Sequence, residues 1–253
     1  MHNFKYGFLL RQLVARGFKV RYNRSVLGML WCLLQPALML GVMYVVFSFI
    51  FKSSIHNFAL YLISGIIMYN FFGETSSEIM ASISGNAKLI NKVNVPKLLY
   101  PLTCAIYGLI NLLIAFVPLM FVVLVTDARI SWHYLLIPFA VLCTLILAIG
   151  IGLILATLMV FFRDTKFLWT FACQILMYAT PIFYPIDRIP AHAQVIFYVN
   201  PLYHNITFMR TILLGNQVPP LSSFLACLVT CIVPLALGYV FFRKMEDRFI
   251  LYL

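Results

Sequence analysis

Long apolar runs separated by short basic breaks constrain this chain more than any other feature of its sequence. Six such runs follow one another, at roughly 26–51, 58–80, 101–125, 133–162, 167–184 and 222–242. About twenty apolar residues in a helix cross the hydrocarbon of a bilayer. A composition of 63% hydrophobic and 10% charged residues is typical of integral membrane proteins. We predict an all-α membrane protein with six transmembrane helices in a single domain, 1–253.

The basic residues are distributed unevenly between the two sides that six spans define. Most of the 18 Lys and Arg residues lie before the first run, in the breaks near 85–100 and 163–166, or after the last run. The others are Lys52, Arg129, Arg188 and Arg210. Cytoplasmic segments carry the excess of Lys and Arg, so we predict that both termini are cytoplasmic and that 185–221 lies outside. This topology also explains the net charge of +11 without nucleic acid as a partner.

The break at 85–100 is too polar to lie in hydrocarbon. Its basic residues are Lys88, Lys92 and Lys97. Residues 86–94 can form about two helical turns before the chain reaches Pro96. Lys88 and Lys92 are four residues apart and share a helix face, beside an apolar strip of Leu89 and Val93. Such a segment can lie flat at the membrane surface and be held by a cytoplasmic partner; the alternative is an ordinary solvated loop.

The N-terminal segment, 1–24, contains an amphipathic helix at 3–21. One side of this helix carries Lys5, Gln12, Arg16 and Lys19, and the other carries Tyr6, Leu10, Leu13, Val14 and Phe18. A basic amphipathic helix next to a membrane span lies in the membrane interface. We predict a cytoplasmic interface helix, with a packed cytoplasmic helix as the alternative.

The segment at 185–221 is rich in proline but contains two apolar stretches, 196–199 and 202–214. These stretches are apolar enough to re-enter the outer leaflet as short helices. Irregular backbone at that depth is tolerated only where protein or a water-filled cavity surrounds it. We predict re-entrant helices that form an outer gate, with a static interfacial cap as the alternative.

The residue pattern offers no catalytic machinery. The five histidines are scattered, no P-loop motif occurs, and nearly all of the six cysteines fall inside apolar runs. We therefore expect no metal site and no disulfide, and a chain that is not an enzyme and binds no cofactor itself. A membrane-embedded transferase would need an acid–base or metal cluster. A stand-alone secondary carrier would need ionisable groups near the midplane, whereas Glu74 and Glu78 lie in the cytoplasmic half of the second run.

Several stretches, in order along the whole chain, resemble the ABC-2 type permeases that export polysaccharides, the membrane subunits of O-antigen, capsule and teichoic-acid transporters. They are Arg21-Tyr-Asn-Arg-Ser-Val-Leu-Gly-Met-Leu-Trp31 with Gln35-Pro36, Asn86–Lys97, Phe161-Phe-Arg-Asp164, Pro181-Ile-Phe-Tyr-Pro185, and Asn200-Pro201-Leu202. Each is weak alone, and together they are specific.

The resemblance implies a homodimer of this chain, in a bacterial inner (plasma) membrane, that pairs with two copies of an ABC ATPase. ATP and Mg would be bound by that partner subunit. The stretch at 86–95 would be the coupling helix that docks on the ATPase. Its coupling residues would be Asn86, Lys88, Leu89, Lys92 and Val93.

The cargo implied is a lipid-linked polysaccharide, which joins a lipid tail, a diphosphate and a hydrated polymer. Arginine suits phosphate, so the candidates for the pyrophosphate headgroup are Arg21, Arg24 and Arg163, unless these only reach lipid headgroups. Aromatic rings stack on sugars, so the channel candidates are Tyr44, Phe47, Phe51, Tyr69 and Phe72, unless they pack or face lipid. The outer-gate candidates are Phe183, Tyr184, Pro185, Asn200 and Pro201. The alternative function is an ABC-2 permease for a drug or lipid or, less in keeping with the pattern, a secondary carrier.

Overall fold

The computed structural model describes residues 7, 10–17, 30–46, 57–92, 95–126, 128, 130–186 and 189–252, with side chains at all of these positions except 32, 36, 191 and 193. Within these ranges every regular element is a helix and no strand occurs. The prediction of an all-α chain is confirmed for this part of the sequence.

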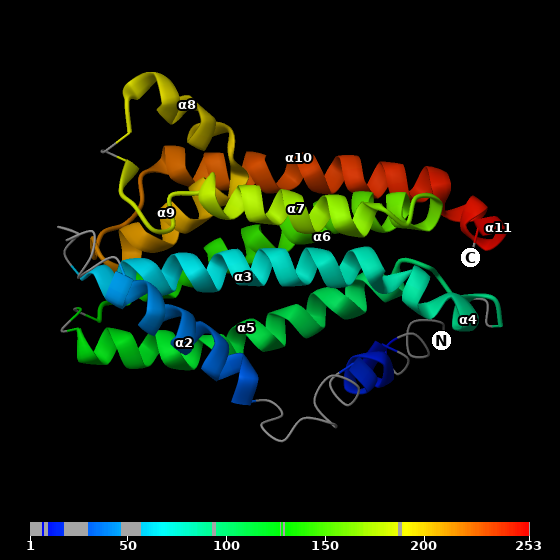
Figure 1. Ribbon diagram of the computed structural model, residues 1–253, viewed down its shortest axis with the longest axis horizontal. Coiled ribbons are helices and arrows are strands. Elements are labelled where there is room, and N and C mark those ends of the chain that lie inside the picture. The colour runs from blue at the N-terminus through cyan, green and yellow to red at the C-terminus, as the bar shows by residue number, and fades with distance from the viewer. Residues whose placement is uncertain are drawn as a thin grey trace.

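Four long helices form the body of the molecule. They are α3 (Phe58–Ser82), α5 (Leu99–Val125), α6 (Ile137–Phe161) and α10 (Leu221–Met245), and they extend along the long axis of the molecule (Figure 1). One end of this body carries the short helices α4 (Ala87–Ile90) and α11 (Phe249–Tyr252), and we call it the α4 end. The opposite end adjoins α9 (Pro201–Leu213), and we call it the α9 end.

Three of the described helical stretches are long and apolar enough to cross a membrane. They are Leu99–Val125, Trp132–Phe161 and Leu221–Tyr252. Helix α3 is also long, but Glu74 and Glu78 lie in its second half. The helices α2 (Leu30–Val45) and α7 (Thr165–Tyr178) have 16 and 14 residues. The count of six spans therefore stays a prediction.

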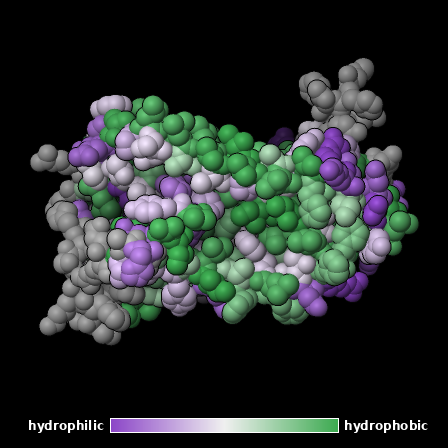
Figure 2. All heavy atoms as spheres, turned by 90° about the horizontal axis from the view of Figure 1, so that it is seen from above, coloured by the Kyte–Doolittle hydropathy of each residue, from purple (hydrophilic) through white to green (hydrophobic). Residues whose placement is uncertain are grey.

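Figure 2 shows the molecule from above. Hydrophobic residues cover the middle of this face, and hydrophilic residues gather toward its ends. An apolar band between polar ends is the surface pattern of a protein that sits across a bilayer.

Glycines allow the long helices to approach closely. A Cβ atom at Gly238 on α10 would collide with the carbonyl oxygen of Gly150 on α6. A Cβ atom at Gly152 would lie 2.6 Å from a side-chain carbon of Ile79 on α3. Small residues at such crossings let helix backbones pack together inside a membrane. Helix α6 is therefore packed tightly between α3 and α10.

Buried apolar side chains form two clusters. The larger one fills the body between α3, α6 and α9, where Leu60, Leu147 and Met209 are fully buried. The smaller one lies at the α4 end, and we call it the α4-end cluster. It consists of Ile83, Ile90, Tyr100, Leu153, Ala156, Val160, Phe242 and Phe249. The two ends of α3 thus have different surroundings.

The fifth apolar run ends earlier than predicted. Helix α7 ends at Tyr178, and residues 179–184 form turns and bends. Pro181 explains this, since proline lacks the N–H that would continue the helix and clashes with the preceding turn. The chain then forms α8 (Ala191–Val199) and α9. Both predicted short helices in this segment are present, and whether they enter a membrane stays a prediction.

The coupling helix is shorter than predicted. Helix α4 is a single turn, preceded by the 3-10 turn η2 (Ser84–Asn86) and followed by a turn at 91–92. Asn86 is the N-cap residue of α4 but makes no side-chain capping bond, and its amide nitrogen donates back to the carbonyl of Ser82 at 2.8 Å. Asn and Val are weak helix formers, and they dominate residues 91–95. Residues 93 and 94 lie outside the described part.

The N-terminal helix has the predicted two faces over residues 10–17. Leu13 and Val14 are partly buried, whereas Arg11, Gln12 and Arg16 are exposed. Leu13 packs against the α4-end cluster. Gly7 is also helical and exposed, and the rest of the predicted interface helix at 3–21 lies outside the described residues.

Candidate functional site

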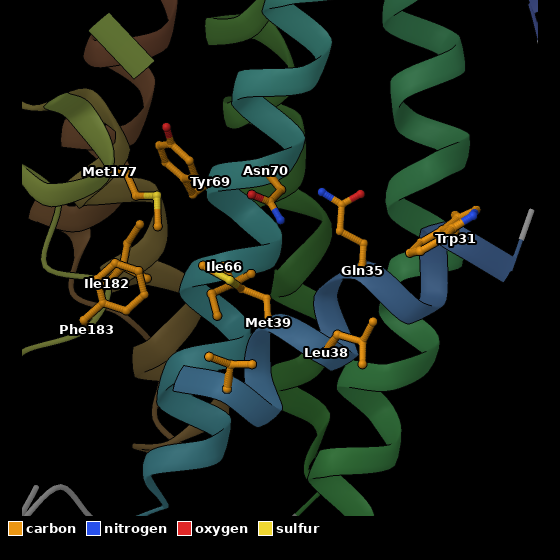
Figure 3. Close-up of a pocket in the computed structure, with 11 residues that line it drawn as sticks. Trp31, Gln35, Leu38, Met39, Ile66, Tyr69, Asn70, Met177, Ile182 and Phe183 are labelled. Atoms are coloured by element: carbon orange, nitrogen blue, oxygen red, sulfur yellow. The ribbon is translucent and has the colours of Figure 1, made fainter. Parts of the chain in front are cut away.

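A groove follows one side of α3 between α2 and α7. It consists of two adjoining pockets of about 380 Å³ each, which share Gln35, Tyr69 and Asn70. In Figure 3 the side chains of Gln35 on α2 and Asn70 on α3 point toward one another. Pockets of this size fall within the usual range for small-ligand sites.

The groove changes from apolar to polar along its length. Toward the α9 end its lining is mostly apolar, with Trp31, Leu38, Met39, Val42, Ile66, Met177, Ile182 and Phe183. Toward the α4 end most of the lining residues have polar side chains, namely Glu74, Ser77, Glu78 and Thr170, beside Gly73 and Cys173. The polar residues of α3 lie on one helix face because their spacing is close to multiples of 3.6. The groove can therefore meet both an apolar and a hydrated part of one ligand.

Helix α7 is attached to α3 by a few specific contacts. The indole N–H of Trp169 donates to the Ser77 hydroxyl at 3.2 Å, and its ring packs edge-on against Phe72 at 6.0 Å. The Tyr69 hydroxyl donates to the carbonyl of Cys173. The opposite side of α7 exposes large apolar residues, namely Phe167, Leu168, Phe171, Ile175 and Tyr178. Helix α7 is therefore one wall of the groove, with an uncovered apolar face behind it.

A buried arginine organises the α9 end of the groove. Arg210 on α9 is 8% exposed, and its two terminal nitrogens donate to three backbone carbonyls. Nη1 donates to Pro181 at 2.7 Å, and Nη2 donates to Tyr61 at 3.0 Å and Ile182 at 3.1 Å. Residues 181–184 are not helical, so their carbonyls lack helical partners. The guanidinium supplies those partners.

Tyr61 completes this arrangement from α3. Its hydroxyl lies 3.0 Å from the carbonyl oxygen of Pro181 and 2.8 Å from that of Tyr184. The Arg210 guanidinium carbon lies 3.4 Å from the centre of the Tyr61 ring, a cation–π contact. We call Arg210, Tyr61 and residues 181–184 the carbonyl bracket.

The predicted gate residues lie around the carbonyl bracket. Phe183 is buried and lines the groove, and Tyr184 packs edge-on against Phe197 at 6.3 Å. Asn200 caps α9 by accepting from the backbone N–H of Leu202, and its amide donates to Thr180 at 2.8 Å. Pro185 and Pro201 are partly buried, with Pro201 in the first turn of α9. The structure thus brings these five residues together, and their movement as a gate stays a prediction.

The predicted coupling residues lie at the α4 end. Lys88 and Lys92 are exposed, and Leu89 is partly buried against the α4-end cluster. Asn86 is held by its bond to Ser82, and Val93 lies outside the described residues. Ile90, which the sequence pattern did not single out, is buried in the α4-end cluster. The exposed lysines are therefore available to a partner while the apolar side is anchored.

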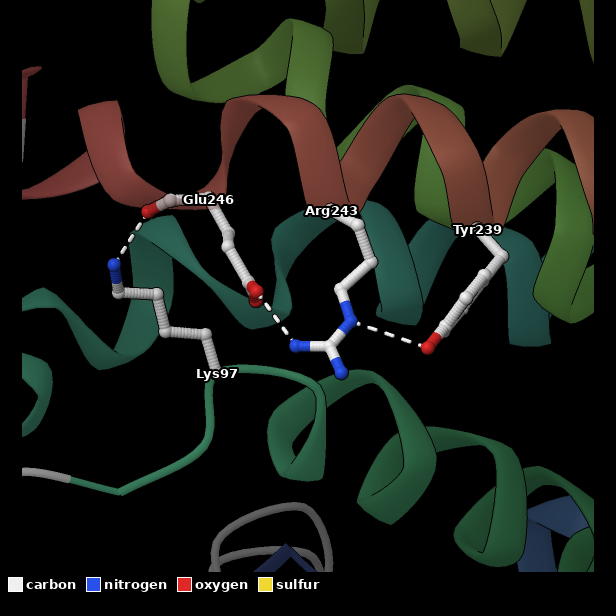
Figure 4. Close-up of polar contacts among 4 residues, drawn as sticks. All are labelled: Lys97, Tyr239, Arg243 and Glu246. Atoms are coloured by element: carbon white, nitrogen blue, oxygen red, sulfur yellow. Dashed lines mark hydrogen bonds and ion pairs between the residues drawn. The ribbon is translucent and has the colours of Figure 1, made fainter.

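A polar chain joins this segment to the C-terminal part of the protein (Figure 4). The Lys97 ammonium donates to the backbone carbonyl of Glu246 and lies 5.8 Å from the ring centre of Phe249. The Glu246 carboxylate pairs with Arg243 at 2.7 Å, and Arg243 donates to the Tyr239 hydroxyl at 3.1 Å. The residues after α10 are thus fastened to Lys97, which lies just beyond the predicted coupling stretch at 86–95.

The remaining predicted residues occupy different environments. Arg163 is exposed just before α7, and Tyr44 is exposed on α2 with its ring centre 6.4 Å from that of Phe58. Tyr69 lines both pockets of the groove. Phe72 is 1% exposed and packs in the core of this chain, so its contact with a polymer stays untested. Arg21, Arg24, Phe47 and Phe51 lie outside the described residues.

Sequence reasoning missed three residues of this site. Gln35 was named only as part of a stretch that resembles the family, yet it lines the groove beside Asn70. Asn70 could have been found, since it begins a polar stripe on one face of an apolar helix. Arg210 entered the sequence analysis only in the count of Lys and Arg on the outer side. Among the described residues no group of His, Cys, Asp or Glu could hold a metal ion.

Comparison with known proteins places this site in a family. The model described as ABC-2 type transporter matches residues 9–214, which include the groove, the coupling segment and the carbonyl bracket. An O-antigen export system permease protein RfbA from Klebsiella pneumoniae is 29% identical over 250 residues, which cover 98% of this chain and 96% of that protein. Its counterpart from Myxococcus xanthus is 27% identical, with 97% and 95% covered. The capsule polysaccharide export inner-membrane protein CtrC from Neisseria meningitidis serogroup A is 23% identical, with 89% and 86% covered. Because the family model spans most of its length, this chain belongs to the ABC-2 type transporter family.

Proposed function

We propose that this chain is the membrane-spanning subunit of an ATP-driven exporter for a polyprenyl-pyrophosphate-linked polysaccharide. The polymer, of O-antigen, capsule or teichoic-acid type, would move from the cytoplasm across the bacterial inner membrane. The names of the relatives support O-antigen and capsule cargo. The observation that carries the proposal is the groove along α3, which is lined by apolar side chains at one end and mostly by residues with polar side chains at the other.

The groove fits a cargo that is itself part apolar and part hydrated. Amide and carboxylate side chains such as Asn70 and Glu74 can exchange hydrogen bonds with sugar hydroxyls. Aromatic side chains such as Trp31 and Tyr69 can stack on sugar rings while one edge stays polar. In this arrangement Arg163, with Arg21 and Arg24, would meet the pyrophosphate.

A second copy of this chain would convert the groove into a channel. The helices that flank it expose large apolar side chains, such as Trp31 on α2 and Phe171 on α7. Uncovered apolar faces of this kind suit a partner subunit as well as lipid. We therefore place the homodimer interface along α2 and α7, with Tyr44, Phe47 and Phe51 toward the polymer.

The α4 end would face the cytoplasm. The chain would cross the membrane six times, so that both termini lie on the cytoplasmic side. Two ATPase subunits would bind there, and they would hold the ATP and Mg that this chain does not bind itself. Lys88 and Lys92 would contact the ATPase. Ile90 would transmit the movement of the ATPase to the α4-end cluster.

The test is ATP hydrolysis by the complex of this chain with its ATPase in proteoliposomes, with and without lipid-linked polysaccharide. We expect the polysaccharide to stimulate hydrolysis and to be transported. A double variant with Lys88→Ala and Lys92→Ala should keep its ATPase but lose the stimulation. Lys244→Ala is the matched control, because this lysine is also exposed at the α4 end and is assigned no contact with the ATPase.

Two results would contradict the proposal. One is purification without any ATPase under conditions that preserve the fold, which would favour a stand-alone carrier. The other is stimulation and transport by a drug or simple lipid and none by the glycan, which would favour the alternative ABC-2 function.

A further inference from the structure

Arg210 is a buried positive charge that donates to three backbone carbonyls. It is 8% exposed, and its donors reach carbonyls of Pro181, Ile182 and Tyr61. Arginine stays protonated in proteins, so burial here places a full charge away from water. An ionisable group at such a place in a membrane protein is costly and therefore points to a function.

The carbonyl bracket needs arginine in particular. A planar guanidinium can donate to carbonyls in several directions while its face stacks on an aromatic ring. Both occur here, since Arg210 donates to three carbonyls and stacks on Tyr61. Gly65 on α3 provides the space. A Cβ atom at Gly65 would lie 2.7 Å from Nη2 of Arg210 and 3.1 Å from a side-chain carbon of Ile182.

The carbonyls that Arg210 holds belong to the wall of the groove. The side chains of Ile182 and Phe183 line the groove, while the Pro181 and Ile182 carbonyls accept from Arg210. Arg210 itself lines neither pocket of the groove. It therefore acts on the groove only through the backbone that it holds.

We infer that Arg210 is a positioning residue for the α9 end of the groove. Together with Tyr61 it fixes Ile182 and Phe183 against α3, and this fixed wall limits passage through that end. Loss of the bracket releases the wall, so that the end of the groove opens without ATP and less polymer moves for each ATP hydrolysed. The inference deepens the proposed function and rests on it for the part that concerns polymer transport.

The first readout is the position of the wall itself, which does not depend on transport. Phe183→Cys is introduced into a chain whose six native cysteines are replaced, and its labelling by a water-soluble maleimide is timed. Phe183 is 4% exposed, so we expect slow labelling with the bracket intact. Arg210→Lys should speed it by about tenfold, the change that loss of one hydrogen bond to a charged group produces. Tyr61→Phe, which removes a hydroxyl bonded to two carbonyls, and Gly65→Ala, whose Cβ atom would displace the guanidinium, should also speed it.

Gly41→Ala is the matched control for Gly65→Ala. Gly41 also lies inside a helix, α2, but a Cβ atom there would meet nothing within 4 Å. We expect its labelling rate to equal that of the parent. Tyr61→Phe removes a single oxygen, so it tests the bracket even if Arg210→Lys does not fold.

The second readout, in proteoliposomes with the ATPase, is polymer exported for each ATP hydrolysed, together with leakage of radiolabelled sucrose without ATP. These measurements use the native Phe183. We expect leakage to rise and export per ATP to fall in the bracket variants. Faster labelling with export and leakage unchanged would overturn the inference, because Arg210 would then have only a structural role.

Unchanged labelling in both Arg210→Lys and Tyr61→Phe would also overturn it, whatever the export. If labelling and sucrose leakage both rise in the bracket variants while the parent complex exports no glycan, the role of the carbonyl bracket is supported and the proposed cargo is wrong. Failure of the inference and failure of the proposed function are thus distinguishable.

Discussion

The two ends of α3 are joined to their surroundings in different ways. At the α9 end, Tyr61 and the buried Arg210 hold residues 181–184 through hydrogen bonds to backbone carbonyls. At the α4 end, Ile83 joins Ile90 and Phe249 in an apolar cluster. Hydrogen bonds depend on distance and angle, whereas apolar packing depends mainly on filled volume.

Because of this difference, the two ends of α3 differ in how freely the attached segments can reorient. The carbonyl bracket permits one arrangement, because a small shift leaves buried carbonyls and a buried charge without partners. The α4-end cluster can reorient while its apolar surface stays buried, because apolar contacts have no required direction. Helix α4, which would move with the ATPase, therefore suits attachment by apolar packing better than attachment by hydrogen bonds.

The largest effect should come from emptying the α4-end cluster. Phe249 is fully buried and packs against Phe242 at 5.3 Å and Phe161 at 6.1 Å. Phe249→Ala should lower the free energy of unfolding in detergent by about 3–5 kcal/mol, since it leaves a cavity. Phe249→Leu should cost only about 1 kcal/mol, because it keeps most of the volume. Equal losses of unfolding free energy in the two variants would contradict the idea that filled volume holds the α4 end together.

The next effect should come from a conservative change in the carbonyl bracket. Arg210→Lys keeps the charge but offers donors on a single nitrogen, so it cannot reproduce the guanidinium contacts. We expect the free energy of unfolding to fall by about 2 kcal/mol. Arg243→Lys is the control, since that side chain is 53% exposed and should change stability by less than about 0.5 kcal/mol. If Arg210→Lys were as stable as Arg243→Lys, the hydrogen bonds of the carbonyl bracket would not hold the α9 end.

The smallest effect should come from the exposed ion pair beside the α4-end cluster. Glu246→Gln removes the charge that pairs with Arg243 but keeps the backbone carbonyl that accepts from Lys97. We expect a loss below about 1 kcal/mol, measured by unfolding at low salt. The loss should shrink near 1 M salt, because ions screen the Arg243 side chain, which is 53% exposed, although Glu246 is only 16% exposed. A large loss that persists in high salt would show that charge, and not packing, holds this end.

The sequence predicted the long helices well, because apolar runs and their basic breaks are local features. The second, third, fourth and sixth runs correspond closely to α3, α5, the helical stretch Trp132–Phe161 and α10. Where the local signal weakens, the prediction is less accurate: α7 ends before Pro181, and α4 is a single turn.

The site was only partly predictable, for a different reason. The motif Pro181–Pro185 contains Ile182 and Phe183 of the groove wall, and Asn200-Pro201 stands at the start of α9, but the sequence indicated only that both belong to an outer segment. Arg210 could not be recognised, since its partners lie 28, 29 and 149 positions away and are backbone atoms without a sequence signature. Counting Lys and Arg on each side treats every loop arginine as solvated.

The glycine contact between α6 and α10 makes α10 a lever. Because the backbones touch at Gly150 and Gly238, α10 can tilt about this point more easily than it can slide along α6. Gly238 divides α10 unequally, and at 1.5 Å per residue the arms measure about 10 Å toward Met245 and about 26 Å toward Leu221. A tilt imposed at the short arm, next to Lys97, would displace the far end of a straight α10 by roughly 2.5 times as much, and a bend at Pro234 would reduce this ratio.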